Sequence, residues 1–325
     1  MTRRAPRGDG DALYTIGLDA LLGTRRFLGT QNLEMSLFLL GTSAAEGRSG
    51  DNLSYGAEFE FPNDPWDVSF GFREVQPNFD PAVGFVGRTA YRRYSPHWSY
   101  SPRPSGHPWI RQFSFTTDLE VHTDLKNELL TRNLNLQVFQ LQTHAGDNFS
   151  INVERNYERL EEDFEIHDGV VLPAGREYGF TRYSFGAQTA NRRLVAVGSS
   201  VEWGDFLSGT RLDYSVDVTL RARTGVIVYM EAEWNRIDLP EGKFQTRLYR
   251  ISPELQFSPW IALVNSIQYD TVSRVLGWQS RFRWILKPGN DLYFVYTHNW
   301  LDDAALGLQT QERRAATKFI YTHRF

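Results

Sequence analysis

The stretch Arg211-Leu-Asp-Tyr-Ser-Val-Asp-Val-Thr-Leu-Arg221 alternates polar and apolar residues at every position. Its apolar residues are Leu, Tyr, Val, Val and Leu, and its polar residues are Arg, Asp, Ser, Asp, Thr and Arg. A period of two is typical of a β-strand with one apolar face, whereas an amphipathic helix repeats every three to four residues. The stretch therefore predicts a long strand whose two faces meet different environments.

The same alternation recurs along the chain, for example in residues 55–61, 66–73, 149–157 and 276–284, and no comparable segment has helical spacing. Strands of about 10 to 14 residues fit this pattern, which is the length that a tilted strand needs to cross a bilayer. About seventeen strands are predicted, near residues 11–22, 30–41, 53–62, 65–75, 89–101, 109–122, 128–142, 147–158, 178–189, 193–204, 210–223, 225–237, 244–257, 259–270, 275–286, 291–300 and 316–325.

The composition excludes several classes of protein. The chain has 325 residues, 14% of them aromatic, and a formal net charge of -4. No uncharged stretch reaches the roughly 20 residues that a membrane-spanning helix needs, and the apolar stretch Met35–Ala45 is about half that length. The absence of cysteine excludes a disulfide scaffold and a thiolate metal site. Nucleic acid is excluded as the main partner, because Lys and Arg (35) do not exceed Asp and Glu (39).

The connections between the predicted strands favour a membrane barrel. Short turns rich in Gly, Pro, Asn and Asp are expected near 63–65, 104–106, 145–147, 191–193, 224–225, 258–259 and 288–290. Longer connections are expected at 42–52, 73–88, 159–177, 238–243 and 301–315. Outer-membrane barrels combine short periplasmic turns with longer extracellular loops. The predicted fold class is therefore an all-β, transmembrane, antiparallel β-barrel of about 16–18 strands, with residues 11–325 as one domain and 1–10 as a disordered or truncated remnant.

The end of the chain carries a further signal. Phe319, Tyr321 and Phe325 share one face of the last predicted strand, and the chain stops on an aromatic residue. This pattern resembles the C-terminal signal that the barrel-assembly machinery of Gram-negative bacteria reads. The expected location is thus the bacterial outer membrane, with outer-membrane lipid and that machinery as partners.

Four segments carry a resemblance to a known family: Asn78-Phe-Asp-Pro-Ala-Val-Gly-Phe-Val-Gly-Arg88, Tyr91-Arg-Arg-Tyr94, Asn156-Tyr-Glu-Arg-Leu160 and Gly169-Val-Val-Leu-Pro-Ala-Gly175. Over essentially the whole chain, the sequence resembles the C-terminal barrel domain of the family known as domain of unknown function 5916. Members of that family usually also carry a secretion signal and a domain similar to carbohydrate-binding module family 9, and many are labelled hydrolases. This sequence carries neither segment, so those labels cannot be assigned to its residues.

The sequence contains no motif of an enzyme, so no catalytic residue and no cofactor is expected; HExxH, GxSxG and Walker sequences are all missing. His97 is interpreted as a hydrated wall residue. The loop at 73–88 is interpreted as a folded plug or cap, because Pro77 and Pro81 stiffen it. An acidic cluster in loop 159–177 could hold a cation, although a solvated loop is the favoured reading; its members are Glu161, Glu162, Asp163, Glu165 and Asp168.

Assigning alternate positions inward predicts a hydrated lumen with mixed charge and an acidic lean. The predicted acidic wall residues are Asp19, Glu34, Glu58, Glu60, Asp67, Asp118, Glu120, Glu154, Glu202, Asp213, Asp217, Glu231, Glu233 and Asp270. The predicted basic ones are Arg73, Arg93, Arg211, Arg221, Arg223, Arg281, Arg283 and Arg324. Because desolvated single charges are costly, cross-strand ion pairs are expected, in particular between Arg221 or Arg223 and Glu231 or Glu233.

Two functions follow from this interpretation. The first is a pore or transport channel, because about 16 to 18 strands leave an aqueous interior; polysaccharide or small solutes are the candidate cargo. The alternative is a membrane anchor that displays a separate glycan-binding or hydrolase-like domain. A soluble all-β binding protein would need a second layer over its apolar faces. An odd strand number would also make the first and last strands parallel, so the sequence predicts at least one further strand upstream, in a longer protein.

Overall fold

The computed structural model describes residues 1–4, 12–43 and 50–322. Eighteen strands form one sheet, and two short strands, β10 (Phe164–His167) and β11 (Val170–Leu172), form another. Within the described residues, no helix is long and apolar enough to cross a membrane. The prediction of an all-β chain with a sheet of about 16–18 strands is therefore confirmed.

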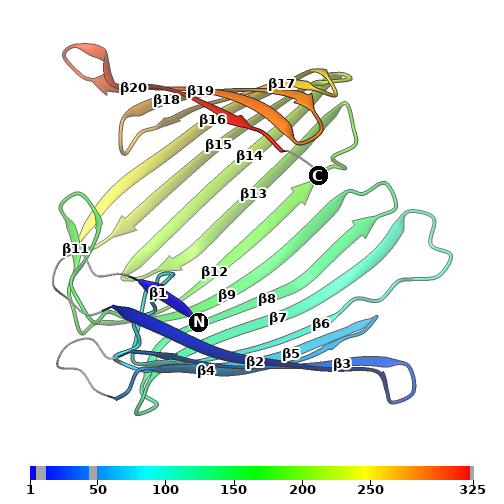
Figure 1. Cartoon of the computed structure of the whole chain (residues 1–325), viewed down its shortest axis with the longest axis vertical. Coiled ribbons are helices and arrows are strands. Elements are labelled where there is room, and N and C mark those ends of the chain that lie inside the picture. The colour runs from blue at the N-terminus through cyan, green and yellow to red at the C-terminus, as the bar shows by residue number, and fades with distance from the viewer. Residues whose placement is uncertain (5–11, 44–49, 323–325) are drawn as a thin grey trace. The chain divides into compact units, whose positions relative to one another are not determined.

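The chain forms two compact units. The first comprises residues 1–141, 151–183 and 206–208, and the second comprises 142–150, 184–205 and 209–325. Antiparallel strands follow one another in the first unit (Figure 1): β1 (Thr2–Arg4), β2 (Leu13–Phe27), β3 (Gln31–Thr42), β4 (Leu53–Pro62), β5 (Trp66–Val75), β6 (Tyr91–Tyr100) and β7 (Ile110–Asp124). The next strands along the chain are β8 (Leu129–Thr143), β9 (Asn148–Arg159), β12 (Glu177–Gln188) and β13 (Val195–Phe206).

The second unit contains a run of antiparallel strands in sequence order: β14 (Gly209–Arg223), β15 (Val226–Leu239), β16 (Gly242–Ser258), β17 (Ile261–Asp270), β18 (Val275–Lys287), β19 (Asn290–Asp303) and β20 (Gly307–Ile320). Apart from β1, β10 and β11, the strands are 10 to 17 residues long. Strands in globular proteins average about 5 to 6 residues, so these have the length typical of membrane barrels.

The apolar face is exposed in both units. In the first unit, Leu18 is 72% and Phe70 46% exposed, and in the second unit Trp284 is 41% and Phe319 58% exposed. The most deeply buried apolar side chains instead lie near strand ends and in connections, such as Leu172 and Leu239. A water-soluble protein buries its large apolar residues, and wide exposed apolar surfaces mark contact with a membrane or a partner.

The predicted alternation of short and long connections holds only in part. Long connections occur in the first unit at 43–52, 76–90 and 160–176. In the second unit both edges have short turns: 240–241, 271–274 and 304–306 at one edge, and 224–225 and 288–289 at the other. The expected long loops at 238–243 and 301–315 are therefore wrong.

The last strand also differs from the sequence prediction. β20 begins at Gly307 and ends at Ile320, whereas a strand over 316–325 was expected. Residues 307–315 are mainly polar on both faces, so no apolar alternation marks them as a strand. Their backbone pairs with β19, for example Asn299 with Glu312. Of the proposed assembly signal, Phe319 lies in β20, Tyr321 follows it, and Phe325 and the predicted wall residue Arg324 lie outside the described residues.

Candidate functional site

A row of directly opposed residues crosses six strands on the polar face of the first unit. In order from β2 to β7 it consists of Asp19, Phe38, Gly56, Arg73, Arg93 and His122. The adjacent row, one step nearer the long connections, consists of Gly17, Leu40, Ser54, Val75, Tyr91 and Asp124. Eight residues of these two rows line one cavity and are here called its floor: Gly17, Asp19, Phe38, Leu40, Ser54, Arg73, Val75 and Tyr91.

Three apolar side chains, Phe38, Leu40 and Val75, interrupt the polar face in these two rows. A Cβ atom on Gly56 would lie 2.6 Å from the Phe38 ring, and a Cβ on Gly17 would lie 2.4 Å from Leu40 Cδ2. Each glycine therefore makes room for the side chain of its cross-strand neighbour. The missing Cβ atoms of Gly56 and Gly17 explain how Phe38 and Leu40 fit on the face that carries the charges.

The connection 76–90, here called the roof loop, covers this part of the face. The Asn78 backbone N–H donates to the Asp51 carbonyl oxygen (2.8 Å), and the Ala82 N–H donates to Thr15 Oγ1 (2.7 Å). Phe79 is buried, and Arg88 Nη2 forms an ion pair with Glu161 Oε2 (2.7 Å). The prediction of a folded cap at 73–88 agrees with these contacts.

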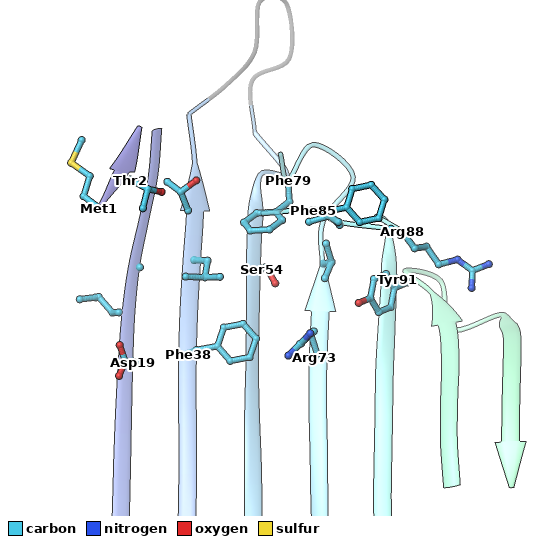
Figure 2. A pocket seen from close by; sticks show the side chains of 17 residues that line it. Met1, Thr2, Asp19, Phe38, Ser54, Arg73, Phe79, Phe85, Arg88 and Tyr91 are labelled. Atoms are coloured by element: carbon cyan, nitrogen blue, oxygen red, sulfur yellow. The ribbon is translucent and has the colours of Figure 1, made fainter. Parts of the chain in front are cut away.

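Between the floor and the roof loop lies a cavity of about 720 Å³. Its apolar lining includes Phe38, Leu40, Val75, Phe79 and Phe85, and its polar lining includes Asp19, Ser54, Arg73, Arg88 and Tyr91. Figure 2 shows Phe38 and Arg73 at similar heights on the two sides of β4, below Phe79. A second cavity of about 110 Å³ shares Phe38 and Arg73 with the first and is also lined by Ser36, Glu58, Arg93 and Ser95.

Two arginines of this site face each other without a carboxylate between them. Arg73 and Arg93 are direct cross-strand neighbours, an arrangement that is destabilising for like charges. Arg93 Nη1 lies 3.7 Å from Glu120 Oε2. Among the described residues, Arg73 has no ion pair, and its guanidinium lies 5.3 Å from the centroid of the Phe38 ring. Of the two, Arg73 therefore presents a charge without an ion pair to the cavity.

The rest of this polar face is acidic. By register, Glu34 lies opposite Glu60, and Glu58 lies opposite Ser36 one row away. His97 Nδ1 is 2.5 Å from Asp118 Oδ1, so this histidine sits in an ion-pair geometry on the wall where the sequence placed it. Glu58, Glu60, Arg73 and Arg93, all predicted to line a lumen, thus share one face.

The second unit repeats this division into two faces. Most of its predicted wall residues share one face by register: Arg211, Asp213, Asp217, Arg221, Glu231, Glu233, Asp270, Arg281 and Arg283. Arg223 does not, because a bulge after Arg221 shifts it opposite Val226.

The expected pairing of Arg221 or Arg223 with Glu231 or Glu233 is wrong for Glu231. Its Oε2 accepts a hydrogen bond from Arg250 Nη1 (3.0 Å). Register is the reason, since Glu231 lies opposite Arg250 on β16, whereas Arg221 lies opposite Ile227.

The acidic loop does not gather its carboxylates. Asp163 Oδ1 accepts a hydrogen bond from the Ala174 N–H (2.8 Å), and Glu165 Oε1 accepts one from the Gly169 N–H (2.9 Å). Glu161 is paired with Arg88. Among residues 1–4, 12–43 and 50–322, no three acidic or histidine side chains are grouped as a metal site requires. These carboxylates, with Glu162 and Asp168 in the same loop, therefore do not form the cation site that the sequence left open as the less favoured reading.

The sequence alone does not single out Phe38, Leu40 or Arg250. Phe38 and Leu40 belong to the uncharged stretch 35–45, which is apolar at both parities and so hides which face is polar. The sequence signal that could indicate the site is the combination of that apolar stretch with Gly17 and Gly56 on the flanking strands. Arg250 lies in a strand where both faces mix polar and apolar residues, so its orientation depends on register.

No family model matches the chain, so its resemblance to the domain of unknown function 5916 family stays an expectation. No curated protein matches it either. Among solved structures, the chain is similar to a mutant of the ferric enterobactin receptor of Pseudomonas aeruginosa, with 10% sequence identity and a TM-score of 0.41. The match covers 98% of this chain and 71% of the receptor chain. At this TM-score, nothing about the receptor is carried over to this chain.

Proposed function

We propose that this chain is an outer-membrane β-barrel that acts as a pore for small solutes, with its polar face lining a water-filled interior. The observation that carries the proposal is the division of both units into an exposed apolar face and a charged face. In lipid, every backbone polar group needs a partner, and a strand sheet achieves this only by closing into a barrel. A closed sheet of this size leaves an aqueous interior.

The ends of the apolar face support the proposed membrane position. Aromatic side chains gather near the short turns of the first unit, where Trp66 stacks on Tyr100 with ring centroids 4.2 Å apart. Trp98 lies 5.7 Å from Trp66. Aromatic girdles at the two interfaces are typical of outer-membrane barrels. Outer-membrane lipid and the barrel-assembly machinery, which would read Phe319 and Tyr321, are the proposed partners.

The charges of the polar face set the expected ion preference. On strands β3 to β7 of the first unit, the arginines Arg73 and Arg93 are outnumbered by the carboxylates on the same face, namely Glu34, Glu58, Glu60, Asp67, Asp118, Glu120 and Asp124. A wall with this excess of negative charge concentrates cations. A modest preference for cations is therefore expected.

Single-channel conductance in a planar bilayer tests this function, with purified protein folded in detergent and a salt gradient across the membrane. We expect conductance with a reversal potential that indicates cation preference, and a larger conductance when residues 77–89 of the roof loop are replaced by a short Gly-Ser linker. Anion preference would contradict the assignment of the polar face. No conductance in either protein would reject the pore and leave the anchor as the function.

A further inference from the structure

We infer that the cavity under the roof loop binds an amphipathic monocarboxylate, with the carboxylate between Arg73 and Arg93 and the apolar body against Phe38, Leu40 and Phe79. The inference names a ligand for the polar face, and it rests on the proposed function only in requiring that this face is reached from water. It does not require that the barrel conducts.

The charged end of the cavity fits an anionic head group. Arg73 and Arg93 lie directly opposite each other and both line the small cavity of about 110 Å³. An anion between them would convert a like-charge contact into two charge-assisted hydrogen-bonding interactions, which are among the stronger ones in proteins. The Ser36 and Ser95 side chains line the same space and can donate to a carboxylate oxygen, although Ser95 Oγ also lies 3.4 Å from the Gly71 carbonyl oxygen.

The same end favours one negative charge over two. Glu58 lines the small cavity together with the two arginines, so this lining carries a net charge of about one positive unit. Glu120 partly neutralises Arg93, because its Oε2 lies 3.7 Å from Arg93 Nη1. A monocarboxylate matches this balance, whereas a dianionic phosphate would face Glu58 with an excess of negative charge.

The other end of the cavity fits an apolar body. Its volume of about 720 Å³ lies within the range of about 300–1,000 Å³ that is typical of small-molecule sites. Phe38, Leu40, Val75 and Phe79 give it an apolar lining on a face that otherwise carries charges. Gly17 and Gly56 leave the space that Leu40 and Phe38, respectively, occupy on this face. A wall that only faces water would not require this apolar lining, whereas an apolar ligand would pack against it.

The roof loop encloses this space from the side of the long connections. Phe85 and Arg88 line the cavity, and the ion pair of Arg88 with Glu161 ties the roof loop to the connection 160–176 within the same unit. Arg88 and Asp19 are the other charged side chains that line the large cavity. Arg88 is already paired with Glu161, and Asp19 lies three strands from Arg73 in the same row. Arg73, which also lines the small cavity, is therefore the group that sets the preference for an anion there.

Isothermal titration calorimetry of the full chain in nanodiscs tests the inference, with octanoate as the probe and octylamine, octanol and octyl phosphate as matched probes. Empty nanodiscs give the partition of each probe into lipid, which is subtracted. We expect saturable binding of octanoate, at least about tenfold weaker binding of octylamine and octanol, and weaker binding of octyl phosphate. Equal heats for octanoate and octanol would overturn the inference, because they indicate partition into an apolar space alone.

Substitutions locate the site. Arg73→Gln should weaken octanoate binding by about tenfold or more, since it removes one charge-assisted contact. Gly17→Ala should also weaken binding, because the new Cβ displaces the Leu40 side chain from the floor. Arg281→Gln is the matched control: it removes an arginine from the polar face of the second unit and should leave binding unchanged. Unchanged binding in Arg73→Gln, or an equal loss in Arg281→Gln, contradicts the site.

Two measurements separate this inference from the proposed pore. Heat-modifiable gel migration and circular dichroism confirm that each variant is folded before titration. Octanoate binding without conductance would reject the pore and keep the ligand site. Conductance without saturable octanoate binding would keep the pore and reject the ligand site.

Discussion

At the scale of single residues, the orientation of each side chain follows from its parity in the strand. Val216, on the apolar face of β14, is 37% exposed, while Ser215 next to it lies on the charged face opposite Glu233. In a membrane the first side chain meets lipid and the second meets water. Identical substitutions at these neighbouring positions should therefore have very different costs.

We expect Val216→Arg to destabilise the protein folded in a bilayer by about 2–4 kcal/mol, which is the cost of an arginine near the membrane midplane. The matched variant Ser215→Arg should change it by less than about 1 kcal/mol, because water solvates the new charge and Glu233 lies across from it. Urea titration of folding into lipid vesicles measures both values. Equal costs at the two positions would contradict the assignment of faces.

At the scale of elements, the sequence predicts strands well where one face is wholly apolar. The strand around 211–221 lies within β14, because its apolar residues and charges never mix. β20 was misplaced for the opposite reason: its polar residues at 309–314 give no period, and only pairing with β19 defines the strand. Likewise, the cavity floor could not be predicted, since contacts between Phe38, Gly56 and Arg73 depend on the register of three strands.

Hydrogen exchange tests the revised position of β20. The amides of residues 307–315 that bond to β19 should exchange slowly in nanodiscs, at rates similar to those of 316–320. The turn at 304–306 should exchange fast and provides the internal reference. Fast exchange throughout 307–315 would contradict a strand at these residues and support the loop that the sequence predicts.

At the scale of the whole molecule, the proposed function requires that the charged face meets water while the apolar face meets lipid. The chain contains no cysteine, so any introduced cysteine is the only thiol in the protein. Single cysteines at consecutive positions 212–219 of β14 can therefore report the environment of each side chain separately.

The most direct test is the labelling rate of these cysteines with a bulky, charged maleimide after reconstitution into lipid vesicles. We expect rapid labelling at 213, 215, 217 and 219, which lie on the charged face. We expect protection at 212, 214, 216 and 218, which lie on the apolar face. Labelling after denaturation confirms that every thiol is reactive. Uniformly rapid labelling at all eight positions in vesicles would contradict a membrane-spanning β14 with one face in water.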